Sequence, residues 1–192
     1  MAKKRKKKKS AGKFVVLFFL IGILALMFYV FRQEIIHSLS PWLEKWSLVE
    51  KRREVLLYFS DREGEYLMGE KREIIKKNQV KEEARETISE LIKGPKGKLT
   101  PTLPPRTKLL TLQINDVGVA SVNFNSVLSK DHPGGSTAEM MTVYSIVNSL
   151  AINFPQIKRV QIFINGKPIE SIAGHLSLKQ PIPPKPDLIK RQ

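Results

Sequence analysis

The chain has 192 residues, no cysteine, and 33 Lys and Arg against 18 Asp and Glu, a formal net charge of +15. The lack of cysteine excludes disulfide bonds and a lipid-modified N-terminal cysteine. Much of the charge lies in residues 1–13, which hold eight basic side chains, whereas residues 50–192 carry 23 basic and 16 acidic ones. That larger part is only moderately basic, so we expect no nucleic-acid partner.

Residues 1–13 form a basic tail, and residues 14–31 follow without a charged side chain. This apolar segment reaches roughly 27 Å as a helix, close to the hydrocarbon core of about 30 Å. Because Lys and Arg flanks resist translocation, we expect a single-pass membrane helix with a cytoplasmic N-terminus and an extracytoplasmic C-terminal domain. The alternative is a cleaved signal peptide, whose apolar region is shorter and ends in small residues. Here the segment ends in bulky side chains at 28–31.

Residues 32–50 are predicted to form a juxtamembrane stalk. Leu39, Trp42, Leu43 and Trp46 recur at helical spacing, and tryptophan favours the headgroup level of a membrane. Both a helix lying at the interface and a short helix packed on the globular domain explain this pattern.

Residues 51–180 are long enough for one globular domain with a single core. The elements expected in its first half are a strand at 54–60, weaker strand candidates at 66–68 and 73–76, a helix at 79–93, and a Pro- and Gly-rich loop at 96–107. Alternation places Val55, Leu57 and Phe59 on one face of the first strand. Gly94 and Pro95 are typical of a helix end, because glycine adopts the C-cap conformation and proline cannot continue a helix.

The second half of this domain is expected to contain four strands and one helix. The elements expected there are strands at 108–114, 119–125, 158–164 and 168–172, and a helix from Ser136 to just before Pro155. In the first of these strands Leu110, Leu112 and Ile114 alternate with polar residues. Ser136 and Glu139 have the spacing of a capping box, which predicts that both side chains bond the helix N-terminus.

The element order β-β-α-β-β-α-β-β predicts an α+β fold. We expect two helices packed on one face of a mostly antiparallel sheet, preceded by one N-terminal transmembrane helix. Residues 181–192, rich in proline and then charged, are predicted to be a disordered tail.

Residues for catalysis or metal binding are sparse. The histidines are His37, His132 and His175, and only Asp131 with His132 approaches the short spacing of metal ligands. There is no thiol in the sequence, and no hydroxyl stands beside an oriented base in any recognisable pattern. We therefore expect no catalytic, cofactor-binding or metal-ligating residues.

Two other hypotheses, an anion-binding site and a glycoside hydrolase, concern residues that have simpler structural explanations. Gly134, Gly135 and Ser136 precede a helix and could cradle an anion, but phosphate-binding fingerprints are missing from the sequence and a helix cap explains them. A carboxylate pair for glycoside hydrolysis would have to come from Glu139, Glu170 or Asp116. Glu139 is already explained as a capping residue, so we do not expect a hydrolase.

Several segments of residues 54–180 resemble one known family. They are Leu91-Ile92-Lys93-Gly94-Pro95, Thr102-Leu103-Pro104-Pro105-Arg106-Thr107, Val119-Ala120-Ser121-Val122-Asn123-Phe124, the helix from Glu139 to Leu150, Val160-Gln161-Ile162-Phe163-Ile164-Asn165-Gly166-Lys167 and Ala173-Gly174-His175. In this order they are similar to the GerMN domain of spore germination and sporulation proteins. The chain departs from some members in holding one such domain and in having a membrane helix rather than a lipidated cysteine.

The resemblance implies a small α+β domain without known catalytic residues that works by protein–protein contact in a bacterial envelope assembly. The sheet face opposite the helices, or the loop 99–106, would then be the contact surface. A binding module for an anionic wall polymer or small ligand is the alternative, because residues 50–192 are basic. A hydrolase using His132 or His175 is a third possibility.

Overall fold

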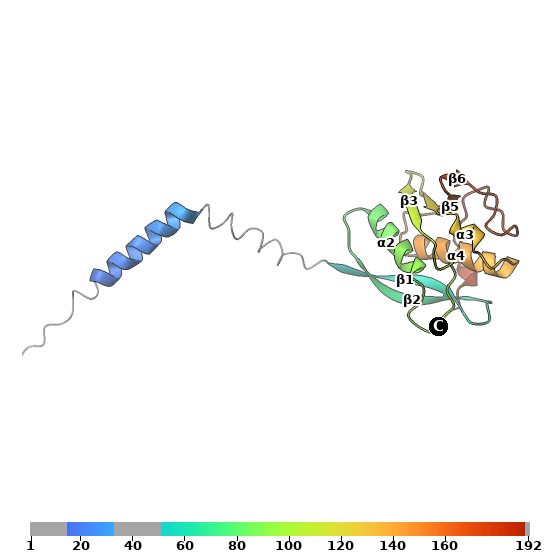
Figure 1. The fold of residues 1–192 in the computed structure, drawn as a ribbon, viewed down its shortest axis with the longest axis horizontal. Coiled ribbons are helices and arrows are strands. Elements are labelled where there is room, and N and C mark those ends of the chain that lie inside the picture. Colours follow the sequence, from blue (N-terminus) through green and yellow to red (C-terminus); the bar gives the residue numbers. More distant parts are fainter. Residues whose placement is uncertain (1–14, 33–50, 191–192) are drawn as a thin grey trace, which may run out of the picture. The chain divides into compact units, whose positions relative to one another are not determined.

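The computed structural model describes residues 15–32 and 51–190 (Figure 1). They belong to two compact units, Met1–Val49 and Glu50–Gln192. The first contains the helix Val15–Arg32, which is long and apolar enough to cross a membrane by length and composition. The predicted basic tail, residues 33–50 of the predicted stalk and His37 lie outside the described residues, while Arg32 is the last residue of this helix.

The globular unit holds two sheets, where a single sheet was expected. Strands β1 (Arg52–Ser60) and β2 (Leu67–Ile75) form an antiparallel hairpin. The second sheet has the order β3-β4-β5-β6. Its strands are β3 (Leu109–Ile114), β4 (Val119–Phe124), β5 (Arg159–Ile164) and β6 (Lys167–Pro168). The helices are α2 (Val80–Ile92), α3 (Val127–Lys130) and α4 (Ser136–Ala151), with a 3-10 turn η1 (Pro186–Leu188).

Strand pairing confirms an α+β fold that is mostly antiparallel. The exception is β4 with β5, which run parallel and are joined by a crossover that carries α3 and α4. The strand candidates at 66–68 and 73–76 prove to be one continuous strand, β2. The charged residues between them obscured it, because Arg72 is buried as an ion pair rather than exposed.

The main core lies where α2 and α4 pack on each other and on strands of both sheets. It includes Leu57 and Phe59 from β1, Ile88 from α2, Val122 from β4 and Ile146 from α4. All five side chains are fully buried, and burying one such side chain contributes about 1.5–3 kcal/mol. A smaller cluster on the other face of the hairpin joins Tyr58, Leu67, Met141 and Leu188.

Helix α4 also protects the edge of β1 that faces away from β2. The backbone N–H of Leu56 donates to Asn153 Oδ1 over 2.9 Å, and that of Tyr58 donates to Ser149 Oγ over 3.0 Å. Side chains at the C-terminal half of the helix and just beyond it therefore replace a neighbouring strand. This explains why polar residues are buried on α4, and it closes one strand edge to strand addition.

Leu110 departs from the expected alternation in β3. A β-bulge falls between Leu109, which pairs with Phe124, and Thr111, which pairs with Asn123. The extra residue turns Leu110 outward, where its side chain is 42% exposed, whereas Leu112 is fully buried as expected.

The expected strand at 168–172 ends after Pro168. Proline has no N–H for a further ladder bond, and the N–H of Ile172 is used by the carboxylate of Glu139. The chain then continues as a loop.

The prediction of a disordered tail from residue 181 is wrong for residues 181–190, the C-terminal segment. Ile182 pairs with Val160 of β5, and Ile189 pairs with Leu67 of β2, so the segment touches both sheets. Asn148 of α4 fixes its middle, since its side chain bonds both the N–H and the C=O of Lys185. Long-range contacts with buried Leu188 outweigh the proline-rich composition.

Candidate functional site

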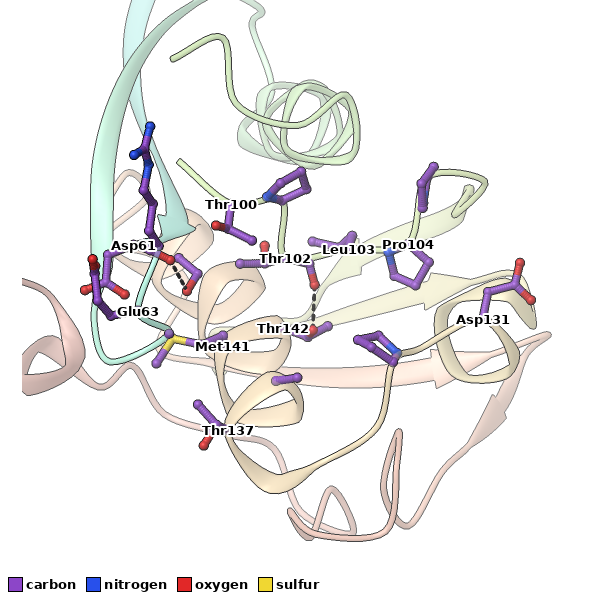
Figure 2. A pocket seen from close by; sticks show the side chains of 17 residues that line it. Asp61, Glu63, Thr100, Thr102, Leu103, Pro104, Asp131, Thr137, Met141 and Thr142 are labelled. Carbon is purple, nitrogen blue, oxygen red and sulfur yellow. Dashed lines mark hydrogen bonds between the residues drawn. The ribbon is translucent and has the colours of Figure 1, made fainter. Parts of the chain in front are cut away.

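An open groove of about 530 Å³ lies between the Pro-rich loop and the start of α4 (Figure 2). This loop at 99–106 is one of the two contact surfaces that the resemblance suggested, beside the sheet face opposite the helices, and two further walls complete the groove. One is the turn at 60–64 between β1 and β2, and the other is the first two turns of α4. The lining residues are Ser60, Asp61, Arg62, Glu63, Gly64, Thr100, Pro101, Thr102, Leu103, Pro104, Pro105, Asp131, Pro133, Thr137, Ala138, Met141 and Thr142.

Backbone pairing ties the loop wall to the hairpin wall. Ser60 and Thr100 exchange two hydrogen bonds, with N···O distances of 3.2 and 2.9 Å. Asp61 then shapes the hairpin turn, since its Oδ1 accepts from the N–H of Glu65 and of Tyr66. With both walls anchored, the groove is preformed rather than made by a flexible loop.

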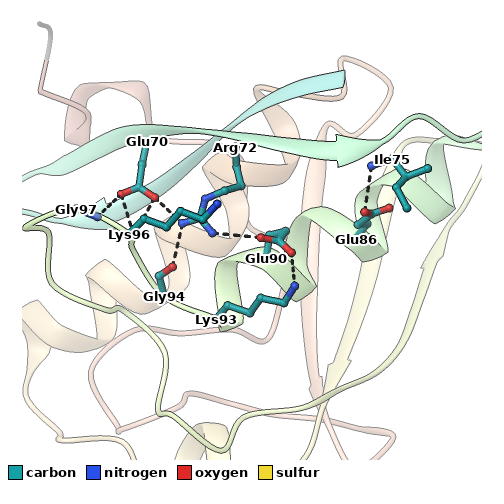
Figure 3. A network of polar contacts seen from close by, with 9 residues as sticks. All are labelled: Glu70, Arg72, Ile75, Glu86, Glu90, Lys93, Gly94, Lys96 and Gly97. Carbon is teal, nitrogen blue, oxygen red and sulfur yellow. Dashed lines mark hydrogen bonds and ion pairs between the residues drawn. The ribbon is translucent and has the colours of Figure 1, made fainter. Parts of the chain in front are cut away.

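A buried ion cluster fixes the chain just before the loop (Figure 3). Arg72 of β2 is 4% exposed and pairs with Glu70 at 2.5 Å and with Glu90 of α2 at 3.2 Å. Its guanidinium also donates to the C=O of Gly94. Glu70 in turn accepts from the N–H groups of Lys96 and Gly97, which holds the exit of α2 against the hairpin.

The pKa values of both carboxyl groups in this cluster reflect the balance between burial and pairing. Burial would raise the pKa of Glu70, but bonds from Arg72 and from two backbone N–H groups lower it below its ordinary value. The pKa of Glu90 is likewise lowered, because Lys93 and Arg72 outweigh its burial. Both groups therefore stay ionised at neutral pH.

A chain of hydrogen bonds runs behind the groove through two of its lining residues, Thr102 and Thr142. The N–H of Gly134 donates to Nδ1 of His132 over 3.0 Å, so that nitrogen carries no proton. Nε2 of His132 therefore donates to Thr142 Oγ1 over 3.0 Å, and the hydroxyl of Thr142 donates to the C=O of Thr102. Thr102 Oγ1 bonds Ser145 Oγ over 2.7 Å. The chain joins the Pro-rich loop to α4.

His132 and Thr142 resemble a base beside a nucleophile, but their roles are reversed. The imidazole nitrogen that faces Thr142 donates its hydrogen, and Thr142 is a buried residue, 2% exposed, whose hydroxyl is already bonded to a carbonyl. Burial lowers the pKa of His132, and the nearby negative charge of Glu139 raises it by less. The neutral ring is therefore favoured. The geometry serves to hold the loop, because nucleophilic catalysis needs an accepting base and a reachable oxygen.

Glu139 does not form the predicted capping box. The residue before α4 is Gly135, whose φ is 84°, and no side chain caps the helix. Instead the fully buried carboxylate accepts four backbone N–H groups of the loop 172–176, at 2.7 to 3.3 Å. Burial would raise the pKa of Glu139, but these donors lower it overall.

The other candidate residues do not converge on one site. Asp131 lies at the groove rim and binds Arg106 at 2.7 Å. Glu170 pairs with Lys179 on the surface, and Asp116 is exposed in the β3–β4 turn. His175 contributes its backbone N–H to Glu139. Within residues 15–32 and 51–190, no group of three or more His, Cys, Asp or Glu is placed to hold a metal ion.

The sequence did not reveal the hairpin turn and the helix side as walls of the groove. Asp61, Thr137, Met141 and Thr142 come from segments up to 81 positions apart in the chain. The Asp-Arg-Glu-Gly turn was a local signal at 61–64, but nothing local shows that it faces the Pro-rich loop.

Several solved structures resemble the chain. A protein from Clostridium perfringens described as a lipoprotein is 26% identical, with 74% of this chain and 95% of that one covered and a TM-score of 0.52. The first GerMN domain of the sporulation protein GerM from Bacillus subtilis is 20% identical over 72% of this chain and 98% of that one, with a TM-score of 0.53. No curated protein sequence matches the chain.

The tandem GerMN domains of the same Bacillus subtilis protein match at 19% identity and a TM-score of 0.54, over 71% of this chain and 48% of that one. The chain thus spans about half of the tandem structure. At these identities the two GerM structures support the shared fold. The model of the Germane family, described as sporulation and spore germination, matches residues 56–170. Because this match covers more than half of the chain, the protein belongs to the Germane family.

Proposed function

We propose that this chain is a membrane-anchored, non-enzymatic domain that docks another protein of a bacterial envelope assembly in sporulation or germination. The N-terminal helix is the anchor, with the N-terminus in the cytoplasm and the globular domain outside. The partner is an envelope protein, and nucleic acid plays no part.

The groove is the observation that carries this proposal. Its walls offer four prolines, Leu103 and Met141, while its backbone and hydroxyl groups are largely engaged within the domain. A rigid, mostly apolar cleft with a polar rim fits an extended peptide segment better than a reacting substrate. The imidazole of His132 and the hydroxyl of Thr142 are both engaged in hydrogen bonds within the domain, so neither is free to act on a substrate.

Crosslinking in living cells tests the docking. A photoreactive amino acid at Thr137 or Pro105 lies exposed at the groove, whereas one at Ser89 on α2 does not line it. We expect one discrete protein adduct from both groove positions and none from Ser89. Filling the groove by Thr137→Trp should remove the adduct formed from Pro105, and Ser89→Trp should leave it.

Equal crosslinking from Ser89, or no adduct from either groove position, would contradict the proposal. The anionic-polymer alternative makes a different prediction. Binding would then be retained in Thr137→Trp and would weaken steeply with added salt, because it would rest on long-range charge.

The anchor has its own test. Full-length protein should stay with membranes after an alkaline wash, and protease added to intact cells stripped of wall should digest residues 51–190. Release by the wash would indicate cleavage or a peripheral attachment, and protection from protease would reverse the topology.

A further inference from the structure

One end of the globular domain gathers four segments that are distant in sequence. It is the end at which β1 begins, directly after residues 33–50, which connect the domain to the N-terminal helix. We call it the basic end and define it as residues 51–53, 76–81, 115–118 and 152–159.

Hydrogen bonds hold these four segments together. The N–H of Lys76 donates to the C=O of Lys51 over 2.7 Å, and Arg53 donates to the C=O of Asn153 over 2.6 Å. The N–H of Lys158 donates to the C=O of Gly118, also over 2.7 Å. The basic end is therefore one continuous surface of the folded domain.

Positive charge dominates this surface. Its basic residues are Lys51, Arg52, Arg53, Lys76, Lys77, Lys81, Lys158 and Arg159, and the acidic residues among or beside them are Glu50, Glu54, Glu73, Glu82, Glu83 and Asp116. Glu73 and Glu83 are already paired with Arg52 and Arg53. Within residues 51–190, Lys76, Lys77 and Lys158 form no ion pair, so their charge is left for an external anion.

Two aliphatic side chains project among these charges. Val117 is 76% exposed, the highest value for a large hydrophobic residue in residues 51–190, and Ile152 is 39% exposed. The turn that presents Val117 is rigid, since Asn115 Oδ1 accepts from the N–H of Val119 over 2.8 Å. Gly118 has φ 82° and packs so tightly that a Cβ would lie 2.6 Å from the C=O of Gln156.

We propose that the basic end docks on the anionic phospholipid surface of the membrane that holds the N-terminal helix. Lysines around a small aliphatic tip are complementary to headgroup phosphates above a hydrocarbon layer. This inference rests on the proposed anchor, which confines the domain near that surface through residues 33–50. Strands of nine residues span roughly 30 Å, and the groove lies at the opposite end of the β1–β2 hairpin. Docking would thus turn the groove away from the lipid.

Fluorescence quenching on the full-length protein tests this docking. The natural chain lacks cysteine, so Val117→Cys and Glu63→Cys each give one labelling site, at the basic end and at the groove end. The labelled proteins are placed in vesicles of neutral phosphatidylcholine, or of the same lipid with about one third phosphatidylglycerol. Both contain a lipid that quenches the label near the headgroups.

We expect quenching at position 117 to be about threefold stronger in the anionic vesicles, and to fall to the neutral level at about 0.5 M salt. Quenching at position 63 should be weak in both. The variant Lys76→Glu/Lys77→Glu/Lys158→Glu should lose the extra quenching. The matched variant Lys96→Glu/Lys98→Glu/Lys130→Glu, with the same charge change elsewhere, should keep it.

Flotation of the same samples after an alkaline wash separates the two proposals. Protein that floats with both kinds of vesicle, but shows equal quenching at positions 117 and 63, overturns the docking and leaves the anchor intact. Protein that is washed off overturns the anchor and the docking with it. Equal loss of quenching in both triple variants would also contradict docking through the basic end.

Discussion

Two carboxylate anchors hold two loops in this domain, and they do so by different means. Glu139 of α4 holds the loop 172–176 through backbone N–H groups alone. Glu70 and Glu90 hold the exit of α2 through Arg72, a buried side chain that carries a full opposite charge. The first anchor depends on one side chain and neutral donors, whereas the second depends on a balance of charges. Substituting one residue should therefore lower the stability of the domain more at the second anchor than at the first.

The largest effect is expected from Arg72→Met in residues 50–192, a compact unit with its own core. The substitution leaves Glu70 and Glu90 partly buried without their shared cation, and breaking such a pair costs about 3–5 kcal/mol. Urea denaturation would measure it. The triple variant Arg72→Met/Glu70→Gln/Glu90→Gln also removes the two unpaired negative charges, so part of the lost stability should return. A triple variant no more stable than the single one would assign the loss to packing of the arginine stem instead.

A smaller loss is expected from Glu139→Gln. The amide keeps one acceptor oxygen but loses the charge and half of its accepting capacity, and a bond to a charged group is worth about 1.5–3 kcal/mol. Amide hydrogen exchange should quicken at Ile172, Ala173, His175 and Leu176, with the loop 94–97 unchanged. Equal acceleration in both loops would mean that the two anchors are not independent.

Acid should weaken the Glu139 anchor. Its pKa is lower in the folded state than the ordinary 4.5, so its contribution is complete above that value and is lost as pH falls through the folded pKa. The stability difference between wild type and Glu139→Gln should thus shrink below about pH 4.5. Thermal unfolding at a series of pH values measures this, and a difference that stays constant into acid would show that the charge is not what holds the loop.

The smallest effect is expected at Arg106 and Asp131 on the groove rim. Their side chains are 81% and 35% exposed, and solvent screens such pairs to about 0.2–1 kcal/mol. Urea denaturation of Arg106→Ala should show a loss of stability at the low end of that range. A loss similar to that of Glu139→Gln would indicate that the rim helps to hold the Pro-rich loop.

Local signals were enough to predict the two long helices and most of the strands. The helix expected at 79–93 is α2 (Val80–Ile92), because Gly94 and Pro95 end it by backbone geometry. The turn at Asn165 and Gly166 has φ of 49° and 78°, as a tight hairpin turn requires. These features depend on a residue and its near neighbours.

The misplaced features depend on distant partners. Glu139 fits a capping box by spacing, but its donors lie more than 30 residues further along the chain. Leu110 fits the alternating pattern of the sequence, but a bulge turns its side chain outward. The bulge is set by pairing with β4. The groove was not predicted, although the Pro-rich loop that forms one wall was named as a possible contact surface, since its other walls are brought there by folding. Periodicity cannot report any of these contacts.

The C-terminal segment has a consequence for how the domain is made. Pairing of Ile189 with Leu67 closes a loop of more than 120 residues, and such closure is late and slow in folding. The small cluster around Leu188 therefore cannot assemble until residue 188 has been synthesised. With the proposed topology, the domain would cross the membrane before this last contact forms, and it would gain its full stability only on the outer side.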